Sequence, residues 1–127
     1  MKIAANIAGG LLGFVFAALS LMVLLGLAPA PKLTEGSPEA SYMAAMAPTG
    51  YLIFVLVCEF IGGILVAIPR TRNLGLLVLG PIVINILAYH TFIMKGGGLV
   101  GPPLLVAALA AFLLWTERKA FAGLVRR

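Results

Sequence analysis

Four long apolar segments, at about residues 3–27, 50–68, 74–93 and 99–115, leave the chain few ways to fold. Each has roughly 17–25 residues, which as a helix matches the ~30 Å hydrocarbon core of a bilayer. Helices satisfy their own backbone hydrogen bonds in lipid, and the alternating pattern of a membrane barrel strand is absent. The segments predict an all-α, integral membrane four-helix bundle that occupies residues 1–127 as a single membrane domain.

The composition excludes an ordinary soluble domain. Hydrophobic residues make up 62% of the chain and charged residues only 10%, whereas about a quarter of the residues in a soluble domain are charged. The net charge of +5 does not predict nucleic-acid binding, because the basic residues lie at the ends of the apolar segments. Cys58 is the single cysteine, so a disulfide within the chain is excluded.

The basic residues predict the orientation in the membrane. If the N-terminus is cytoplasmic, that side carries seven of them: Lys2, Arg70, Arg72, Arg118, Lys119, Arg126 and Arg127. The other side carries two, Lys32 and Lys95. Cytoplasmic loops are enriched in Lys and Arg, so we expect both termini in the cytoplasm. Asn6 lies near the same face, close in depth to Arg70 and Arg72.

The first segment also resembles a secretory signal. Lys2 precedes it, and Ala28-Pro29-Ala30 resembles a cleavage site. However, its apolar stretch of about 25 residues exceeds the usual 7–15 of a signal core. Pro31 would also follow the cut, where its rigid ring fits poorly. We therefore expect the segment to be retained as a membrane span.

Residues 28–49 form the one sizeable predicted loop, on the outer side of the membrane. Its prolines resist a continuous helix. Ser37-Pro38-Glu39 is nevertheless a typical helix start, with a capping hydroxyl, a proline and an acid in the first turn. Tyr42, Met43 and Met46 would give this helix an apolar stripe. We expect a short interfacial helix on the outer leaflet, and a lid over a substrate site is the alternative.

Glu59 stands in the middle of segment 50–68, where a carboxyl group usually faces protein, a partner or a pathway. From the helix rise, Glu59 lies about 14 Å and Asn85 about 17 Å from the cytoplasmic ends of their segments, so they share a mid-membrane layer. Three interpretations stay open. Glu59 is a protonated acid hydrogen-bonded to Asn85 between helices, a carboxyl that handles protons or binds a ligand, or a contact with a partner subunit.

Tyr51, His90 and Ser20 form a second candidate layer, roughly 24–26 Å from the cytoplasmic side. Tyr51 and Glu59 lie on one i, i+4 row and therefore face broadly the same side. Asn85 and His90 are about 140° apart on an ideal helix, so they share a cavity only if a kink rotates one of them.

Small residues and a proline mark the predicted helix-packing seam. Gly9 and Gly13 form a Gly-x-x-x-Gly pattern in the first segment. Gly63 in the second segment lets a neighbouring helix approach closely. Pro81 removes one backbone donor and frees a carbonyl group in the preceding turn. Asn85 can bond either to that carbonyl or to a neighbouring helix.

No recognised catalytic motif is present. A Ser–His–Asp set, a phosphate-binding loop and a covalent haem motif are all missing from the sequence. One histidine and one acid at different depths are too few ligands to predict a metal site.

Three stretches resemble the DoxX-like family of small four-helix membrane proteins: Gly50-Tyr51, Glu59-Phe-Ile-Gly-Gly-Ile-Leu, and Pro81-Ile-Val-Ile-Asn85-Ile-Leu-Ala-Tyr-His90. The resemblance covers nearly the whole chain, and Glu59, Asn85 and His90 match the family's recurrent polar positions. The first segment departs, because relatives often carry an Asn and a His where residues 18–23 are almost wholly apolar. The resemblance implies a bacterial-type inner (cytoplasmic) membrane and a redox-associated role, since the family name comes from a subunit of a membrane thiosulfate:quinone oxidoreductase.

The leading hypothesis is a redox-associated subunit that binds a quinone or similar lipophilic molecule between its helices. Glu59 and Asn85 would form the polar core of the pocket, with Tyr51 and His90 at its outer mouth, because quinone carbonyls need hydrogen-bond donors in an apolar slot. The chain would be an accessory subunit more than an enzyme on its own. Its partners would be the lipid bilayer, a membrane or redox-enzyme subunit, or a second copy of itself, and no nucleic acid.

Two further functions stay open. One is a non-catalytic scaffold or assembly subunit, in which the polar residues only join helices. The other is a proton-coupled exporter of small molecules similar to the small multidrug resistance proteins. Those exporters place their essential acid in the first helix, and the first segment here has none.

Overall fold

The computed structural model describes residues 2–29 and 32–125 of the 127-residue chain. In these ranges all regular structure is helical, as the sequence predicts. Ala30 and Pro31, which bear on retention of the first segment, lie outside the described residues, as do Arg126 and Arg127.

Four long and four short helices follow one another along the described ranges. The long helices are α1 (Lys2–Leu24), α3 (Tyr51–Ala67), α4 (Arg72–Ala88) and α5 (Pro102–Thr116). The short ones are α2 (Pro38–Met46), the 3₁₀ helix η1 (Pro69–Thr71), the π-helix η2 (Tyr89–Ile93) and α6 (Arg118–Ala122). η1 connects α3 to α4, and η2 continues α4 without a break.

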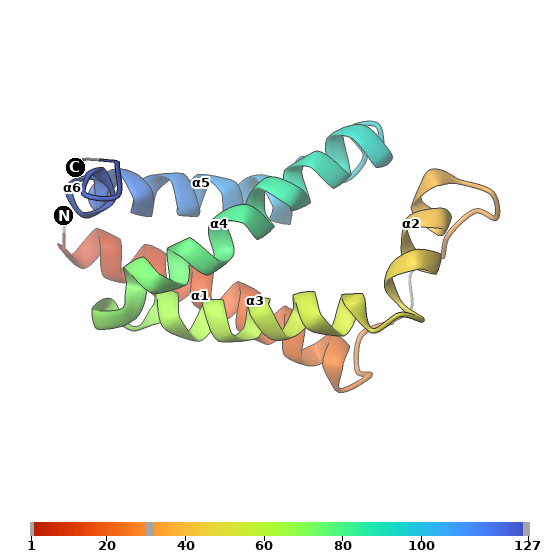
Figure 1. Cartoon of the computed structure of the whole chain (residues 1–127), viewed down its shortest axis with the longest axis horizontal. Coiled ribbons are helices and arrows are strands. Elements are labelled where there is room, and N and C mark those ends of the chain that lie inside the picture. Colours follow the sequence, from red (N-terminus) through yellow and green to blue (C-terminus); the bar gives the residue numbers. More distant parts are fainter. Residues whose placement is uncertain (1, 30–31, 126–127) are drawn as a thin grey trace.

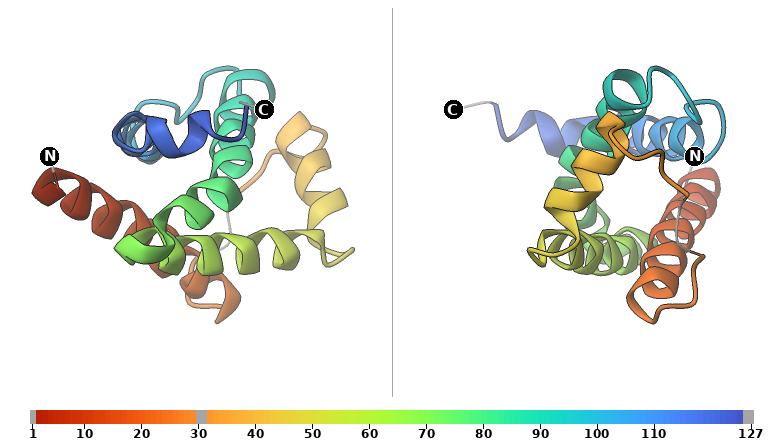
Figure 2. Two further views of the ribbon diagram at one scale, coloured as in Figure 1. Left: turned by 60° about the vertical axis from the view of Figure 1, so that its left-hand side comes forward. Right: turned by 90° about the vertical axis from the view of Figure 1, so that its right-hand side faces the viewer.

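The four long helices surround one apolar core. α1 packs against α3 and α5, and α4 packs against the same two helices (Figures 1 and 2). Each of them contributes a side chain with no exposed surface: Leu12, Val66, Leu79 and Leu113. Because protein interiors are packed as densely as organic crystals, interlocking side chains from four helices hold these helices in one arrangement.

The closest helix approach joins α1 to α3 at Gly13 and Gly63. A Cβ atom on Gly13 would collide with the carbonyl oxygen of Gly63 and would lie 2.8 Å from the Cβ of Ala67. A Cβ atom on Gly63 would lie 2.8 Å from the carbonyl oxygen of Gly13. Only glycine allows the two backbones to come this close.

α2 begins where the sequence predicts a helix start. The hydroxyl of Ser37 accepts a hydrogen bond from the backbone N–H of Ala40 at 3.2 Å, and Pro38 occupies the first turn. α2 and α3 meet at a bend of 83°. Gly50 lies in this bend with φ of 81°, a conformation that favours glycine. α2 therefore crosses over one end of the helix bundle instead of extending α3 (Figure 1).

Helix length supports fewer membrane crossings than the four predicted. Among the described residues, two helical segments are long and apolar enough to cross a membrane, Lys2–Leu24 and Pro69–Ile93. A third would be the bent pair of α2 and α3, counted as one broken span. α5 is apolar but has only 15 residues, which as a helix extends about 22 Å.

Proline and glycine explain why two helices are shorter than their apolar segments. α3 ends at Ala67 because Ile68 precedes Pro69 and is extended, with ψ of 119°. α5 begins at Pro102, which fits the first turn of a helix, after Gly101 at φ of 147°.

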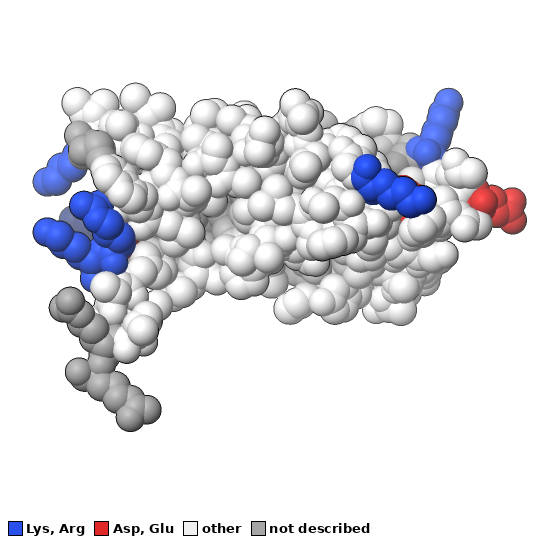
Figure 3. All heavy atoms as spheres, turned by 90° about the horizontal axis from the view of Figure 1, so that it is seen from above, with Lys and Arg blue, Asp and Glu red and all other residues white. Residues whose placement is uncertain are grey.

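Charged side chains gather at the two ends of the molecule. Figure 3 shows Lys and Arg at the end where α1 begins and α6 lies, and a mixture of both signs at the α2 end, with an almost uncharged surface between. Large apolar side chains are exposed on this middle zone, including Phe14 at 70% and Ile84 at 69%. An exposed apolar belt between charged ends is the surface expected of a membrane protein.

Candidate functional site

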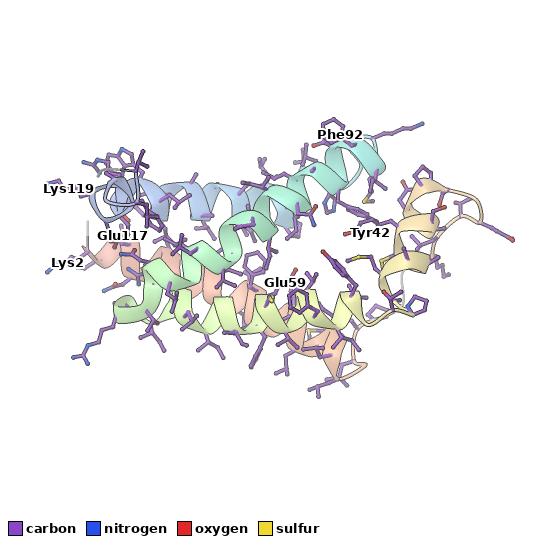
Figure 4. All side chains as sticks on the ribbon, in the orientation of Figure 1. Lys2, Tyr42, Glu59, Phe92, Glu117 and Lys119 are labelled. Carbon is purple, nitrogen blue, oxygen red and sulfur yellow. The ribbon has the colours of Figure 1, made fainter. Side chains whose placement is uncertain are left out.

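A cavity of about 580 Å³ lies between α2, α3 and α4. Its wall is mostly apolar, and its polar groups come from Glu59, Asn85, His90 and three tyrosines. Glu59 extends from α3 towards the space below α4, and Tyr42 extends from α2 towards the same space (Figure 4). The volume falls within the roughly 300–1,000 Å³ of small-molecule sites, which combine apolar walls with a few polar groups.

Glu59 and Asn85 face the same cavity from different helices, Glu59 half-buried and Asn85 exposed. No hydrogen bond found within residues 2–29 and 32–125 joins the two side chains. The structure therefore does not contain the direct Glu59–Asn85 bond that would hold α3 to α4. Both polar groups line the cavity and can contact an occupant.

His90 lies in the π-helical turn η2 and also lines this cavity. Its Nδ1 is 2.9 Å from the carbonyl oxygen of Ile86. A carbonyl oxygen only accepts, so Nδ1 carries a proton, and Nε2 takes no part in this bond. On an ideal helix His90 would point about 140° away from Asn85, yet both side chains line this cavity. His90 belongs to the π turn Tyr89–Ile93, which departs from regular α geometry.

Aromatic contacts connect α2 to the end of the α4 segment. The rings of Tyr42 and Tyr89 have centroids 4.7 Å apart, and Tyr89 meets His90 edge-on at 5.3 Å. Met43 and Met46 line the cavity beside Tyr42. The apolar stripe of α2 thus faces the cavity. Tyr89 was not singled out from the sequence, where its position next to His90 was the only signal.

The other predicted site residues are placed differently. Tyr51 lines the cavity at the first residue of α3 and is 55% exposed. Ser20 is fully buried in α1, and its hydroxyl donates to the carbonyl oxygen of Phe16 at 2.6 Å. Ser20 does not line the cavity, and its hydroxyl is satisfied by its own helix. Cys58 lines it as a free thiol. Within the described ranges, no group of three or more His, Cys, Asp or Glu could hold a metal ion.

A buried arginine at the opposite end of the molecule was not among the predicted site residues. Arg72 is only 3% exposed, and its Nε donates to the carbonyl oxygen of Val66 at 3.2 Å. Its Nη2 donates to Oδ1 of Asn6, also at 3.2 Å. A Cβ atom on Gly9 would lie 2.7 Å from the guanidinium group, so glycine makes room for it. The sequence signal for this contact was that Asn6 and Arg72 lie at similar depths from the predicted cytoplasmic face.

Fold and site together define a small all-helical protein with candidate membrane-spanning helices and an open, largely apolar cavity. The chain is 32% identical over 77 residues to a protein of Bacillus subtilis (strain 168), "Uncharacterized protein YwoB". The alignment covers 61% of this chain and 49% of YwoB, so the chain spans about half the length of this relative. No protein-family model and no solved structure matches the chain. Membership of the DoxX-like family therefore stays a prediction.

Proposed function

We propose that this chain is a DoxX-like integral membrane protein that binds a quinone or similar lipophilic molecule in the cavity between α2, α3 and α4. The observation that carries the proposal is the convergence of Glu59, Asn85 and His90 on one mostly apolar cavity. A lipophilic molecule with a polar head needs both parts of such a site, the apolar wall and a few fixed hydrogen-bonding groups.

The membrane setting belongs to the same proposal. α1, α3, α4 and α5 all cross a bacterial-type inner membrane, with both termini in the cytoplasm. The basic residues at the end where α1 begins support this orientation (Figure 3). A helix as short as α5 is accommodated by local thinning of the bilayer, at a cost of fractions of a kcal/mol per Å.

The polar groups match both redox forms of a quinone. The amide of Asn85 and the hydroxyl of Tyr51 are donors for a quinone carbonyl oxygen. Nε2 of His90 accepts from a quinol hydroxyl when it carries no proton, and the Glu59 carboxyl donates when protonated and accepts when ionised. In this role the chain is an accessory subunit that holds the quinone, and a partner redox enzyme exchanges electrons with it.

Mass spectrometry of lipophilic molecules that co-purify with the full chain from native membranes tests the proposal. We expect a quinone in stoichiometric amounts, reduced several-fold in Glu59→Leu and Asn85→Leu. Glu117→Leu is the matched control, because Glu117 lies at the junction of α5 and α6, away from the cavity. Wild-type protein without any quinone would overturn the proposal. If Glu59→Ala instead lowered thermal stability and released a co-purifying protein with no ligand found, the scaffold function would replace it.

A further inference from the structure

A second cavity, of about 350 Å³, lies between α1, α4 and α5. Leu19 of α1 and Val106 of α5 are part of its wall. Three residues line this cavity and the larger one alike: Glu59, Ile86 and His90. The two cavities therefore adjoin along these shared side chains.

The two cavities differ in chemistry. The larger one has several polar side chains of its own, namely Tyr42, Tyr51, Asn85 and Tyr89. Apart from the shared Glu59 and His90, the smaller one is lined only by apolar side chains and by Gly98. A polar group is matched in the larger cavity, and a hydrocarbon chain is matched in the smaller one.

The ring of His90 is held at the boundary between the cavities. Its Nδ1 bonds to the carbonyl oxygen of Ile86 within its own helix. Its opposite edge faces the loop that precedes α5, where a Cβ atom on Gly98 would lie 3.5 Å from Cδ2. The ring thus extends from the α4 segment towards a residue of the smaller cavity, and its orientation is set by the backbone.

We propose that the two cavities are the two halves of one site, and that its ligand is an elongated amphiphile. The polar ring head lies in the larger cavity, and an apolar chain passes Ile86 between Glu59 and His90 into the smaller one. This inference rests on the proposed function and deepens it, because it assigns the ligand class as a head with a long chain and excludes a compact lipophile.

Binding of two probes to the full-length protein tests the inference: a benzoquinone without a chain, and the same benzoquinone with a ten-carbon chain. Leu19→Trp fills the smaller cavity from a position that is 51% exposed. Leu11→Trp is the matched control, on the same helix, 44% exposed and lining neither cavity. We expect Leu19→Trp to weaken binding of the long-chain probe about tenfold, relative to Leu11→Trp, because the buried chain is displaced. The chainless probe should bind all three proteins equally.

Two outcomes would overturn the inference while leaving the proposed function intact. One is that both probes bind wild-type protein equally. The other is that Leu19→Trp leaves the long-chain probe unaffected, as expected if bulk lipid chains fill the smaller cavity. Failure of both probes to bind wild-type protein would overturn the proposed function as well. If Leu19→Trp lowers the melting temperature, Leu19→Ala replaces it, and a few-fold loss confined to the long-chain probe is then expected.

Discussion

Arg72 of α4 donates a hydrogen bond to Asn6 of α1 at 3.2 Å, across a separation of 66 positions in the sequence. The same guanidinium group donates to the carbonyl oxygen of Val66 in α3. One buried side chain thereby joins three helices at the end opposite the cavity. A buried cation is tolerated only when its donors are satisfied, so Arg72 needs both of these acceptors in place.

Arg72→Lys should destabilise the protein by about 1–3 kcal/mol. Lysine keeps the charge but lacks the planar fork that reaches two acceptors, and one acceptor would lose its bond. Thermal unfolding in detergent measures the change. Arg70→Lys is the control, because Arg70 is exposed in η1 and a surface change of this kind stays within about 0.5 kcal/mol. Equal melting temperatures for the two variants would contradict the role assigned to Arg72.

Gly13→Ala should separate α1 from α3 and lower stability by about 1–3 kcal/mol, because an added Cβ atom collides with the backbone of Gly63. Gly10→Ala is a matched control, since a Cβ atom there meets nothing within 4 Å. Alanine is the better helix former, so this control should be neutral or slightly stabilising. Melting temperatures of both variants check the prediction, and a control that is as unstable as Gly13→Ala would refute it.

Tyr42→Ala should speed ligand release from the larger cavity. The Tyr42–Tyr89 contact is the aromatic link between α2 and the α4 segment, and an aromatic pair contributes about 0.5–1.5 kcal/mol. The corresponding increase in the dissociation rate is about 2–10-fold. Stopped-flow dissociation of the long-chain quinone measures it. Tyr42→Phe keeps the ring and should release the ligand at the wild-type rate; if it matched Tyr42→Ala, the hydroxyl and not the ring contact would be responsible.

Quinone binding should weaken as pH rises, and Glu59→Gln should remove this dependence. A protonated carboxyl donates to a quinone carbonyl oxygen, whereas a carboxylate only accepts, so the bond is lost on ionisation. Glutamine keeps a donor at every pH. Titration of quinone affinity from about pH 3, below the ordinary pKa of a Glu carboxyl, to about pH 9 gives the comparison.

A second variant separates this effect from the histidine on the same cavity wall. Histidine side chains change charge near neutral pH in general, so His90→Gln is measured over the same range. It should retain the fall in affinity that Glu59 produces. A flat profile in His90→Gln together with a sloping profile in Glu59→Gln would assign the pH dependence to His90.

Local pattern was enough to locate the helices. The segments at 3–27, 50–68, 74–93 and 99–115 became α1, α3, the continuous α4–η2 segment and α5, with boundaries shifted by a few residues. Ser37-Pro38-Glu39 likewise marked the start of α2. Helix positions depend on hydropathy, caps and prolines, and each of these signals acts within a few residues of its own place in the sequence.

Local sequence pattern was not enough to predict which residues line the cavity. Helix periodicity placed Asn85 and His90 on different faces, yet both line one cavity, and His90 belongs to a π turn that departs from ideal helix geometry. Depth arithmetic grouped Ser20 with Tyr51 and His90, although its hydroxyl bonds to its own helix. Depth gives the level of a side chain along the helix axis and contains no information about its azimuth or its local partner.

The sequence by itself determined that this protein is helical, apolar along most of its length and basic at its helix ends, because those properties are sums over local residue chemistry. Only the tertiary structure decided that α2 turns back over the bundle, that Arg72 bonds to Asn6, and that Glu59 and His90 lie between two cavities. These relationships require residues far apart in the chain to pack at defined angles, and packing angles are set jointly by all four long helices.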